Sequence, residues 1–316
     1  MSDKPLTPRK TRELDLPAAP RSGQPRHLSA ASGLVCVDSY LYAVADDELH
    51  LGVFRATGME PGGLIRLFPG ELPASKAPRK ARKPDLEALM RLPPFNGHPY
   101  GALLALGSGS TLNRRRGALL TLDALGAVSG NACAVDLAAL FGALDDHFPA
   151  LNIEGGLVNG DELCLLQRGN RNLGSNALIR YQLAPLLEAL GALDSHAGII
   201  APPLKPFDIR SVDLGGIDAT PLCFTDGAAL PDGKIVFSAV AENTRDHYND
   251  GPCVAAAIGI MDMDGDIRCM HQLDQPHKIE GIDARVEGDV IRLLLVTDAD
   301  DAAIPAGLFS AIMELP

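Results

Sequence analysis

Acidic residues recur at similar distances along the chain, each near the start of a short apolar segment. Glu87, Glu154, Asp218 and Glu280 follow one another at intervals of 67, 64 and 62 residues, and Ser32 stands 55 residues before Glu87 in the corresponding place. If these segments are equivalent strands of one repeated unit, four carboxylates meet at one end of the fold. Hard divalent cations take several oxygen ligands, including Asp and Glu carboxylates from separate loops. The four acids are therefore candidate ligands of a Ca²⁺ or Mg²⁺ ion.

A ring of carboxylates also permits two interpretations without a metal. Like charges raise one another's pKa, so that one group can hold a proton and take part in acid–base chemistry. On that hypothesis Glu154 or Glu280 transfers a proton, while Arg168, which follows an apolar strand, holds an anionic group. The alternative is structural: the acids cap strand ends, and Arg168 forms an ion pair with Glu154. No organic cofactor is indicated.

Polar residues in the loops after the second strand of each expected unit are candidate ligand-binding groups. Hydroxyl, amide and guanidinium groups bind small anions. The candidates of these types are Ser108, Arg114, Asn170 and Arg245. Ser108 lies in a Gly-Ser-Gly-Ser run, which forms either a flexible loop or an anion nest of backbone N–H groups. Residues 76–83 are strongly basic: they either join Arg114 in a positive rim beside the second blade or, as we favour, form a solvated charge run.

Other catalytic chemistries lack their sequence motifs. The chain contains no GxSxG, HExxH or CxxC sequence, which disfavours a serine nucleophile of the α/β-hydrolase type and a zinc site. It has nine Phe, five Tyr and no Trp, too few aromatic residues for a platform on which bases or sugars stack.

The elements that position these residues form a repeat. Each unit has an apolar strand, a turn, a second and more apolar strand, a polar loop and a third strand, and a fourth strand can be placed after most units. Turn sequences such as Asn159-Gly160 and Asp232-Gly233 join the first two strands. Four-stranded units repeated around an axis make a β-propeller. We predict one all-β domain over residues 1–316, a five-bladed propeller with six blades as the alternative, and blades near residues 32–69, 86–137, 153–214, 217–273 and 279–315.

The last unit ends after three strands, so that another segment must close the ring. Residues 11–16 can supply a fourth strand from the N-terminal side, which removes an exposed sheet edge. Residues 135–147 and 183–193 have helix-like spacing of Leu and Ala and are predicted to form short helices between strands. Residues 74–84 are predicted to be a loop. A two-domain α/β architecture is disfavoured because the long helices it needs are missing.

Charge and targeting features limit the partners. The chain has 28 basic and 40 acidic residues, but residues 1–116 hold 17 of the basic and 11 of the acidic ones. The acidic excess argues against a general nucleic-acid binder, while the basic first third leaves room for a local anion site. No signal peptide or membrane-spanning run is recognised, and the six scattered cysteines suit a reducing compartment. We expect a cytoplasmic protein that binds a small anionic molecule and not a membrane, with a protein partner as a further option.

Short motifs resemble those of bacterial phytase-like and gluconolactonase-like propellers, with uncharacterised members as the closest match. The sequences IEGG at residues 153–156 and IEGI at residues 279–282, with LEAL at residues 86–89 as a degenerate copy, are similar to the Glu-Gly step of that group. The strand endings QRGN and TDADD also resemble it, and the likeness extends over residues 28–315. The resemblance implies Ca²⁺ at the channel mouth, where it polarises a phosphate or lactone. The matching acidic positions are Glu87, Glu154, Asp218 and Glu280.

Three functions remain open at this point. The first is binding of a small anionic ligand at the channel mouth, with or without a divalent cation. The second is a Ca²⁺- or Mg²⁺-dependent hydrolase of a phosphoester or lactone, and the third is a protein-interaction scaffold. A propeller fold is compatible with all three, so the site itself has to decide.

Overall fold

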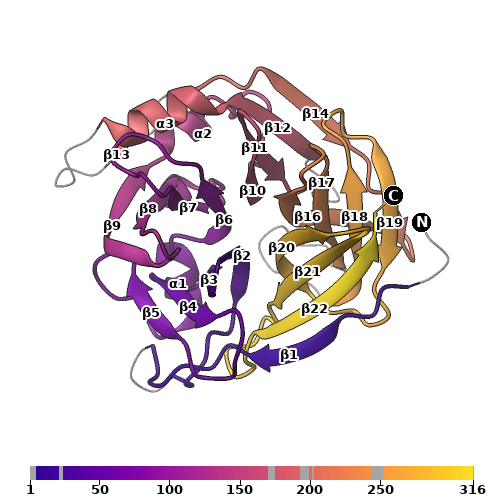
Figure 1. Cartoon of the computed structure of the whole chain (residues 1–316), viewed down its shortest axis with the longest axis horizontal. Coiled ribbons are helices and arrows are strands. Elements are labelled where there is room, and N and C mark those ends of the chain that lie inside the picture. The colour runs from indigo at the N-terminus through magenta and orange to yellow at the C-terminus, as the bar shows by residue number, and fades with distance from the viewer. Residues whose placement is uncertain are drawn as a thin grey trace.

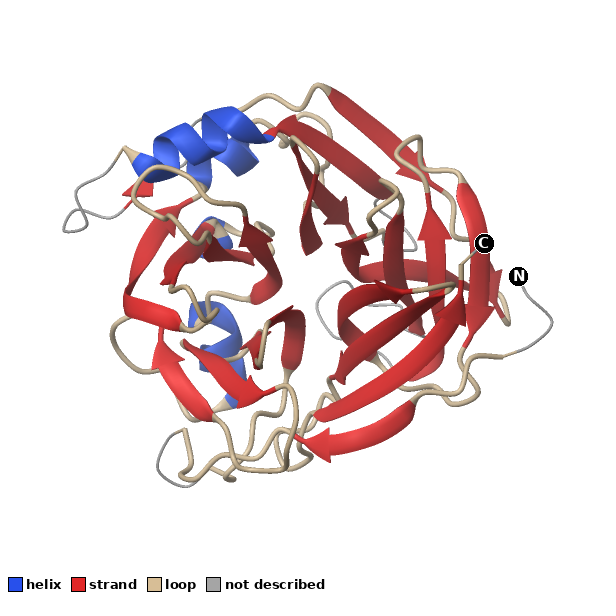
Figure 2. Ribbon diagram, viewed as in Figure 1, coloured by secondary structure: helices blue, strands red, loops and turns tan. Residues whose placement is uncertain are grey.

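The computed structural model describes residues 5–20, 24–169, 175–192, 199–200, 203–242 and 252–315. Within these residues the strands form five sheets that stand side by side around a central axis (Figures 1 and 2). The prediction of an all-β, five-bladed propeller is confirmed, and the six-bladed alternative is wrong.

The first three blades take their main strands in chain order from the channel outward. Blade one contains β2 (Ala31–Val37), β3 (Tyr40–Ala45), β4 (His50–Arg55) and β5 (Gly63–Arg66); blade two contains β6 (Leu86–Leu92), β7 (Ala102–Gly107), β8 (Arg116–Leu122), β9 (Val128–Asp136) and the short parallel β13 (Ile199–Ile200); blade three contains β10 (Ile153–Asn159), β11 (Glu162–Gln167), β12 (Asn176–Gln182) and β14 (Asp208–Val212).

The last two blades each depart from this plan. Blade four contains β15 (Gly216–Ile217), β16 (Thr220–Ala229), β17 (Ile235–Glu242), β18 (Cys253–Met261) and β19 (Ile267–Gln272), and blade five contains β20 (Ile279–Glu287), β21 (Val290–Thr297), β22 (Gly307–Glu314) and β1 (Arg9–Glu13). The N-terminal β1 pairs with β22 in antiparallel orientation and closes the ring, as predicted. This pairing covers the outer edge that β22 would otherwise expose.

Short helices lie in the connections. α2 (Ala138–Gly142) and α3 (Leu183–Gly191) form inside the two segments predicted to be helical. α1 (Lys76–Arg82) forms where a loop was expected, because Pro78 falls in the first turn, which tolerates proline, and Arg79 is anchored to Asp47. A 3₁₀ turn, η1 (Leu112–Arg114), follows β7. None of the described helices has the length and apolar character needed to cross a membrane.

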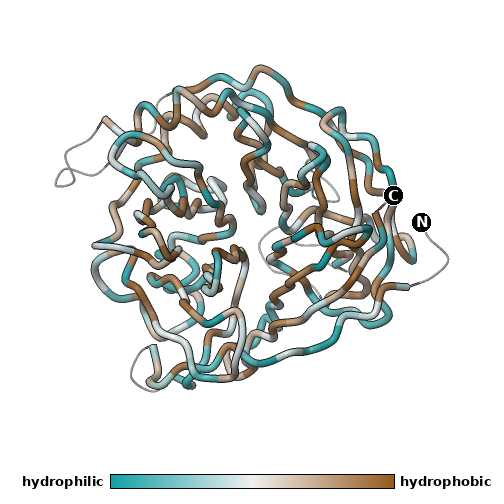
Figure 3. Tube along the Cα trace, viewed as in Figure 1, coloured by the Kyte–Doolittle hydropathy of each residue, from teal (hydrophilic) through white to brown (hydrophobic). Residues whose placement is uncertain are grey.

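The core consists of apolar layers between neighbouring blades. Along β3, Leu41 and Ala43 pack against blade five, while Tyr42 and Val44 pack against blade two. Successive side chains of a strand point to opposite faces, so a strand between two blades is apolar on both. This explains the continuous apolar runs along the strands, which contrast with many hydrophilic connections (Figure 3). The layers hold the inner strands in place around the channel.

Candidate functional site

Each inner strand carries one irregularity in its pairing with the second strand of its blade. The residues at these irregularities, in blades one to five, are Ser32, Glu87, Glu154, Thr225 and Glu280. Such β-bulges redirect a side chain out of the regular alternation. Four of the five are the residues that the repeat spacing placed at the channel mouth.

The prediction for blade four is wrong. Asp218 is exposed and lies with Ala219 in the turn of an extra hairpin between β15 and β16, where the two residues have φ values of 48° and 61°. The equivalent position is Thr225, whose hydroxyl donates a hydrogen bond to Ser238 Oγ at 2.8 Å. β16 begins five residues before its bulge at Thr225. Asp218, the first acidic residue of this unit, therefore comes before the position that is equivalent to Glu87, Glu154 and Glu280. Asp218 therefore does not join the other acids.

In blades one, two, three and five a small residue follows the bulge, because neighbouring inner strands approach closely. A Cβ atom at Gly33 would lie 2.9 Å from the backbone nitrogen of Leu89 in blade two. One at Gly281 would lie 3.0 Å from the backbone nitrogen of Leu34 in blade one. The Glu-Gly step thus combines an acid at the channel mouth with a tight contact between blades.

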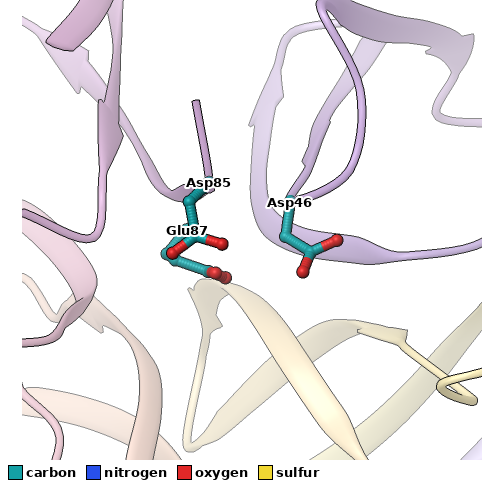
Figure 4. Close-up of side chains that lie close together, drawn as sticks. All are labelled: Asp46, Asp85 and Glu87. Atoms are coloured by element: carbon teal, nitrogen blue, oxygen red, sulfur yellow. The ribbon is translucent and has the colours of Figure 1, made fainter. Parts of the chain in front are cut away.

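Three carboxyl groups meet between blades one and two (Figure 4). Asp46, which follows β3, and Asp85 and Glu87 at the start of β6 place carboxylate oxygens within 4.8 Å of one another. Asp85 directly precedes β6 with a left-handed backbone (φ 57°), and Glu87 is the bulge residue of that strand, so both side chains leave the regular alternation of β6. Within the described part of the chain, no second trio of His, Cys, Asp or Glu side chains meets this criterion. We call these three residues the carboxylate cluster.

Two cations and a hydroxyl group contact the carboxylate cluster. Lys83 Nζ contacts Asp46 Oδ2 and lies 2.8 Å from Asp85 Oδ1, and Arg114 Nη1 lies 2.7 Å from Asp85 Oδ2. Ser108 Oγ donates a hydrogen bond to Asp85 Oδ2 at 2.5 Å. Ser108 and Arg114, expected to bind ligand, thus support a carboxylate here.

Glu87 is the least compensated member of the carboxylate cluster. Its carboxyl group forms no hydrogen bond or ion pair with any described residue. Burial raises its pKa well above the usual value, and the charges of Asp85 and Glu154 raise it further, while Lys83 acts in the opposite direction. Burial also raises the pKa of Asp46. A proton or a bound cation would relieve this excess of negative charge.

A second group of charges surrounds Arg168, which directly follows β11. Arg168 Nη1 lies 3.2 Å from Glu154 Oε2 and 4.0 Å from Glu280 Oε1, and Nη2 lies 2.5 Å from Glu242 Oε2. The structure therefore brings together the three residues proposed for catalysis. Two of the guanidinium nitrogens already bind glutamates, which is the geometry of the structural ion pair considered above.

Lys278 completes this group, which we call the Arg168 network. Its ammonium nitrogen lies 2.8 Å from Asp300 Oδ1, 3.2 Å from Glu242 Oε1 and 3.4 Å from Glu280 Oε1. The last two oxygens are buried and form no hydrogen bond with a residue that the structure describes. Burial raises the pKa of Glu280 well above the usual value, while Lys278 and Arg168 lower it. Glu280 therefore holds a proton more readily than an exposed glutamate.

Acidic groups outnumber cations at the channel mouth. The described residues of the two groups comprise seven carboxyl groups, on Asp46, Asp85, Glu87, Glu154, Glu242, Glu280 and Asp300, and four cations, on Lys83, Arg114, Arg168 and Lys278. Such a centre attracts a cation or a protonated group, so an anion would need a cation beside it. Asn170 and Arg245, also named as ligand-binding candidates, lie outside the described residues.

A cleft of about 300 Å³ adjoins the carboxylate cluster. It lies between α1 and residues 298–302, and Asp46 and Lys83 belong both to its lining and to the contacts described above. The cleft therefore gives a small molecule access to one edge of the cluster.

Several residues of the site were not singled out from the sequence. Asp85 and Lys278 each stand two residues before a bulged glutamate, and this shared offset within the repeat could have identified both. Lys83 lay in the basic stretch interpreted as a solvated charge run, yet it is only 8% exposed. Its partner Asp85 is two residues away, but its partner Asp46 belongs to blade one, and only the folded ring brings Asp46 to it.

Solved structures of several propeller-like enzymes are similar to the chain. A luciferin-regenerating enzyme is 11% identical with a TM-score of 0.49, covering 98% of this chain and 96% of that one. Glutaminyl cyclase of Myxococcus xanthus is 11% identical with a TM-score of 0.48, covering 99% and 100%. An α-L-arabinofuranosidase of Fusarium graminearum is 9% identical with a TM-score of 0.45, covering 96% and 98%.

Sequence comparison gives a family but no characterised relative. No curated protein matches the chain. The grouping with phytase-like or gluconolactonase-like propellers therefore stays a prediction. Residues 27–313, which include all five bulge positions and both charged groups, match the model of a family of unknown function, DUF6929, and the chain belongs to that family.

Proposed function

We propose that the channel mouth binds a divalent cation through Asp46, Asp85 and Glu87, together with a small anionic ligand in the adjoining cleft. The observation that carries this proposal is the convergence of carboxylate oxygens from two blades within 4.8 Å of one another. Ca²⁺ and Mg²⁺ both prefer oxygen ligands, and the flexible coordination of Ca²⁺ suits donors from separate loops. A cation there would attract an anionic ligand, because Asp46 also lines the cleft.

Lys83 would compete with such a cation. Its ammonium contacts Asp46 and Asp85, so a divalent ion has to displace it from two of the three carboxylates. The side chain of Lys83 lines the cleft, which offers it adjoining space. Cation binding would thus exchange an internal counter-ion for an external one, without leaving the carboxylates uncompensated.

Thermal unfolding with and without metal tests this proposal. We expect CaCl₂ or MgCl₂ to raise the melting temperature above that in EDTA, because an ion at 100 times its Kd stabilises the folded state by about 2.7 kcal/mol. Glu87→Gln should abolish the shift, whereas the exposed Asp218→Asn should retain it. Isothermal titration calorimetry gives the affinity directly. Equal melting in metal and in EDTA, or an unchanged response of Glu87→Gln, would refute the proposed cation site.

A metal-dependent hydrolase of a phosphoester or lactone is the second candidate, favoured by Glu280. Burial raises the pKa of this carboxyl group, and a carboxyl group with a raised pKa can act as a general acid toward a leaving group. The cation would contribute polarisation of the scissile oxygen. We expect Glu280→Gln to lose turnover on a panel of phosphoesters and lactones, while Asp218→Asn retains it. If the wild-type protein hydrolyses none of them in CaCl₂ or MgCl₂, hydrolysis is rejected and the binding function stands.

A further inference from the structure

The cleft beside the carboxylate cluster has walls of opposite charge. Its volume of about 300 Å³ lies at the lower end of ligand pockets, so its occupant must be small. One wall is formed by Lys76, Arg79, Lys80 and Lys83 of the α1 region, and the other by Asp298, Asp300 and Asp301 after β21.

Two of the basic side chains are already paired with aspartates that also line the cleft. Arg79 Nη1 lies 2.8 Å from Asp47 Oδ2, and Lys83 contacts Asp46. Lys76, in contrast, is exposed and forms no ion pair or hydrogen bond with a described residue. Its ammonium is therefore available to an anionic group in the cleft.

On the opposite wall, hydrogen bonds fix the aspartates but engage one oxygen of each. Asp298 Oδ1 accepts a hydrogen bond from the backbone N–H of Asp300 at 2.8 Å, and Asp301 Oδ1 accepts one from the N–H of Ala303 at 2.9 Å. No described cation pairs with either carboxyl group, whereas Asp300 pairs with Lys278. The second oxygens of Asp298 and Asp301 are left for a donor.

A singly charged molecule would meet attraction at one wall and repulsion at the other. An ammonium group suits the acidic wall because Asp298 and Asp301 each keep one carboxyl oxygen that the hydrogen bonds from Asp300 and Ala303 leave open. We propose that the cleft binds a small zwitterion, with its anionic group at Lys76 and its ammonium group at Asp298 and Asp301. This inference rests on the proposed function only in placing a ligand at the channel mouth, and it needs no metal.

Calorimetry in EDTA with a series of ω-amino acids tests this inference. The probes are glycine, β-alanine, 4-aminobutyrate and 6-aminohexanoate, with O-phosphoethanolamine as a phosphate member. Butyrate and butylamine serve as one-charged controls. We expect at least one zwitterion to bind about tenfold more tightly than either control, which corresponds to about 1.4 kcal/mol. Its affinity should fall with added NaCl, which screens both contacts.

Variants of the two walls show whether both charges are recognised. Lys76→Ala should weaken the best zwitterion about tenfold while leaving butylamine unchanged, and Asp301→Asn should leave butyrate unchanged. Lys234→Ala, in the turn between β16 and β17, is the matched control and should alter nothing. The inference is overturned if no probe binds, or if butyrate or butylamine binds as tightly as every zwitterion. Because EDTA is present throughout, these results are independent of the Ca²⁺ titration that tests the cation site.

Discussion

Replacing Lys83 by methionine separates the structural and functional roles of the carboxylate cluster. Methionine resembles the aliphatic part of lysine in length but lacks the ammonium group that contacts Asp46 and Asp85. Lys83 is 8% exposed, so the two aspartates lose a buried partner. Removing one member of a buried ion pair costs about 3–5 kcal/mol. In EDTA we therefore expect Lys83→Met to unfold at a clearly lower temperature or urea concentration than the wild type.

The same substitution should strengthen cation binding. In the wild type, a divalent ion must first break the contacts of Lys83, and a hydrogen bond to a charged group contributes about 1.5–3 kcal/mol to stability. Since about 1.4 kcal/mol corresponds to a factor of ten, Lys83→Met should bind Ca²⁺ about 10- to 100-fold more tightly. Added Ca²⁺ should then restore much of the lost stability. A variant that is less stable yet binds its ligand better is not expected from general damage to the fold.

Calorimetric titration with CaCl₂ and thermal unfolding over a range of CaCl₂ concentrations measure both effects. Arg79→Met is the matched control, because Arg79 lies on α1, just before Lys83, and lines the same cleft but pairs with Asp47. It should lose stability without a gain in Ca²⁺ affinity. Unchanged or weaker Ca²⁺ binding by Lys83→Met would refute the idea that Lys83 is the internal counter-ion of a cation site.

Three other substitutions or deletions test the fold. Gly281→Ala should destabilise the protein by about 1–3 kcal/mol in urea denaturation, because the added Cβ would lie 3.0 Å from the backbone nitrogen of Leu34. Burial raises the pKa of Asp283 to about 6, so this group contributes stability at low pH that is lost as the pH rises from about 4 to 6; Asp283→Asn should remove that part of the pH dependence. Deletion of residues 1–13 removes β1, exposes the edge of β22 and should cause association detectable by size-exclusion chromatography.

The repeat was visible in the sequence because each blade needs the same local pattern. Inner strands that approach closely require a small residue such as Gly33 or Gly281, and strands packed between two blades must be apolar on both faces. Small residues and apolar strands therefore recur along the sequence at the spacing of the blades. The closing strand could be predicted as well, because a last blade of three strands would expose an edge.

The two incorrect predictions, for Asp218 and for residues 76–82, have local physical causes. The hairpin between β15 and β16 offers an acid, Asp218, at the expected distance, whereas the bulge of blade four carries Thr225. Residues 76–82 contain a proline and many charges, which suggested a loop, but Pro78 occupies the first turn of α1. In both cases the local pattern was compatible with two structures, and packing against neighbouring strands selected one.

The charged groups were only partly predictable, because their partners come from different blades. Glu154, Glu280 and Arg168 could be placed together, since all three occupy repeat positions. Lys83 and Glu242 could not be assigned partners, because no sequence spacing indicates that the cation directly after α1 contacts Asp46 or that the end of β17 reaches Arg168. Repeat symmetry predicts positions around the ring, while side-chain length decides which charges meet.

The residue types at the five bulge positions show that the fold does not require an acidic residue there. In blades one and four the residues are Ser32 and Thr225, and their hydroxyl groups form hydrogen bonds with Leu86 O at 2.5 Å and Ser238 Oγ at 2.8 Å. A short neutral side chain therefore satisfies the bulge. Glu87, Glu154 and Glu280 instead bring charge into a partly desolvated channel, which costs free energy unless a partner compensates it. Arg168 and Lys278 pair with Glu154 and Glu280, whereas Glu87 forms no ion pair with a described cation and is influenced by Lys83 only through its charge, which is why we propose a bound cation at Glu87.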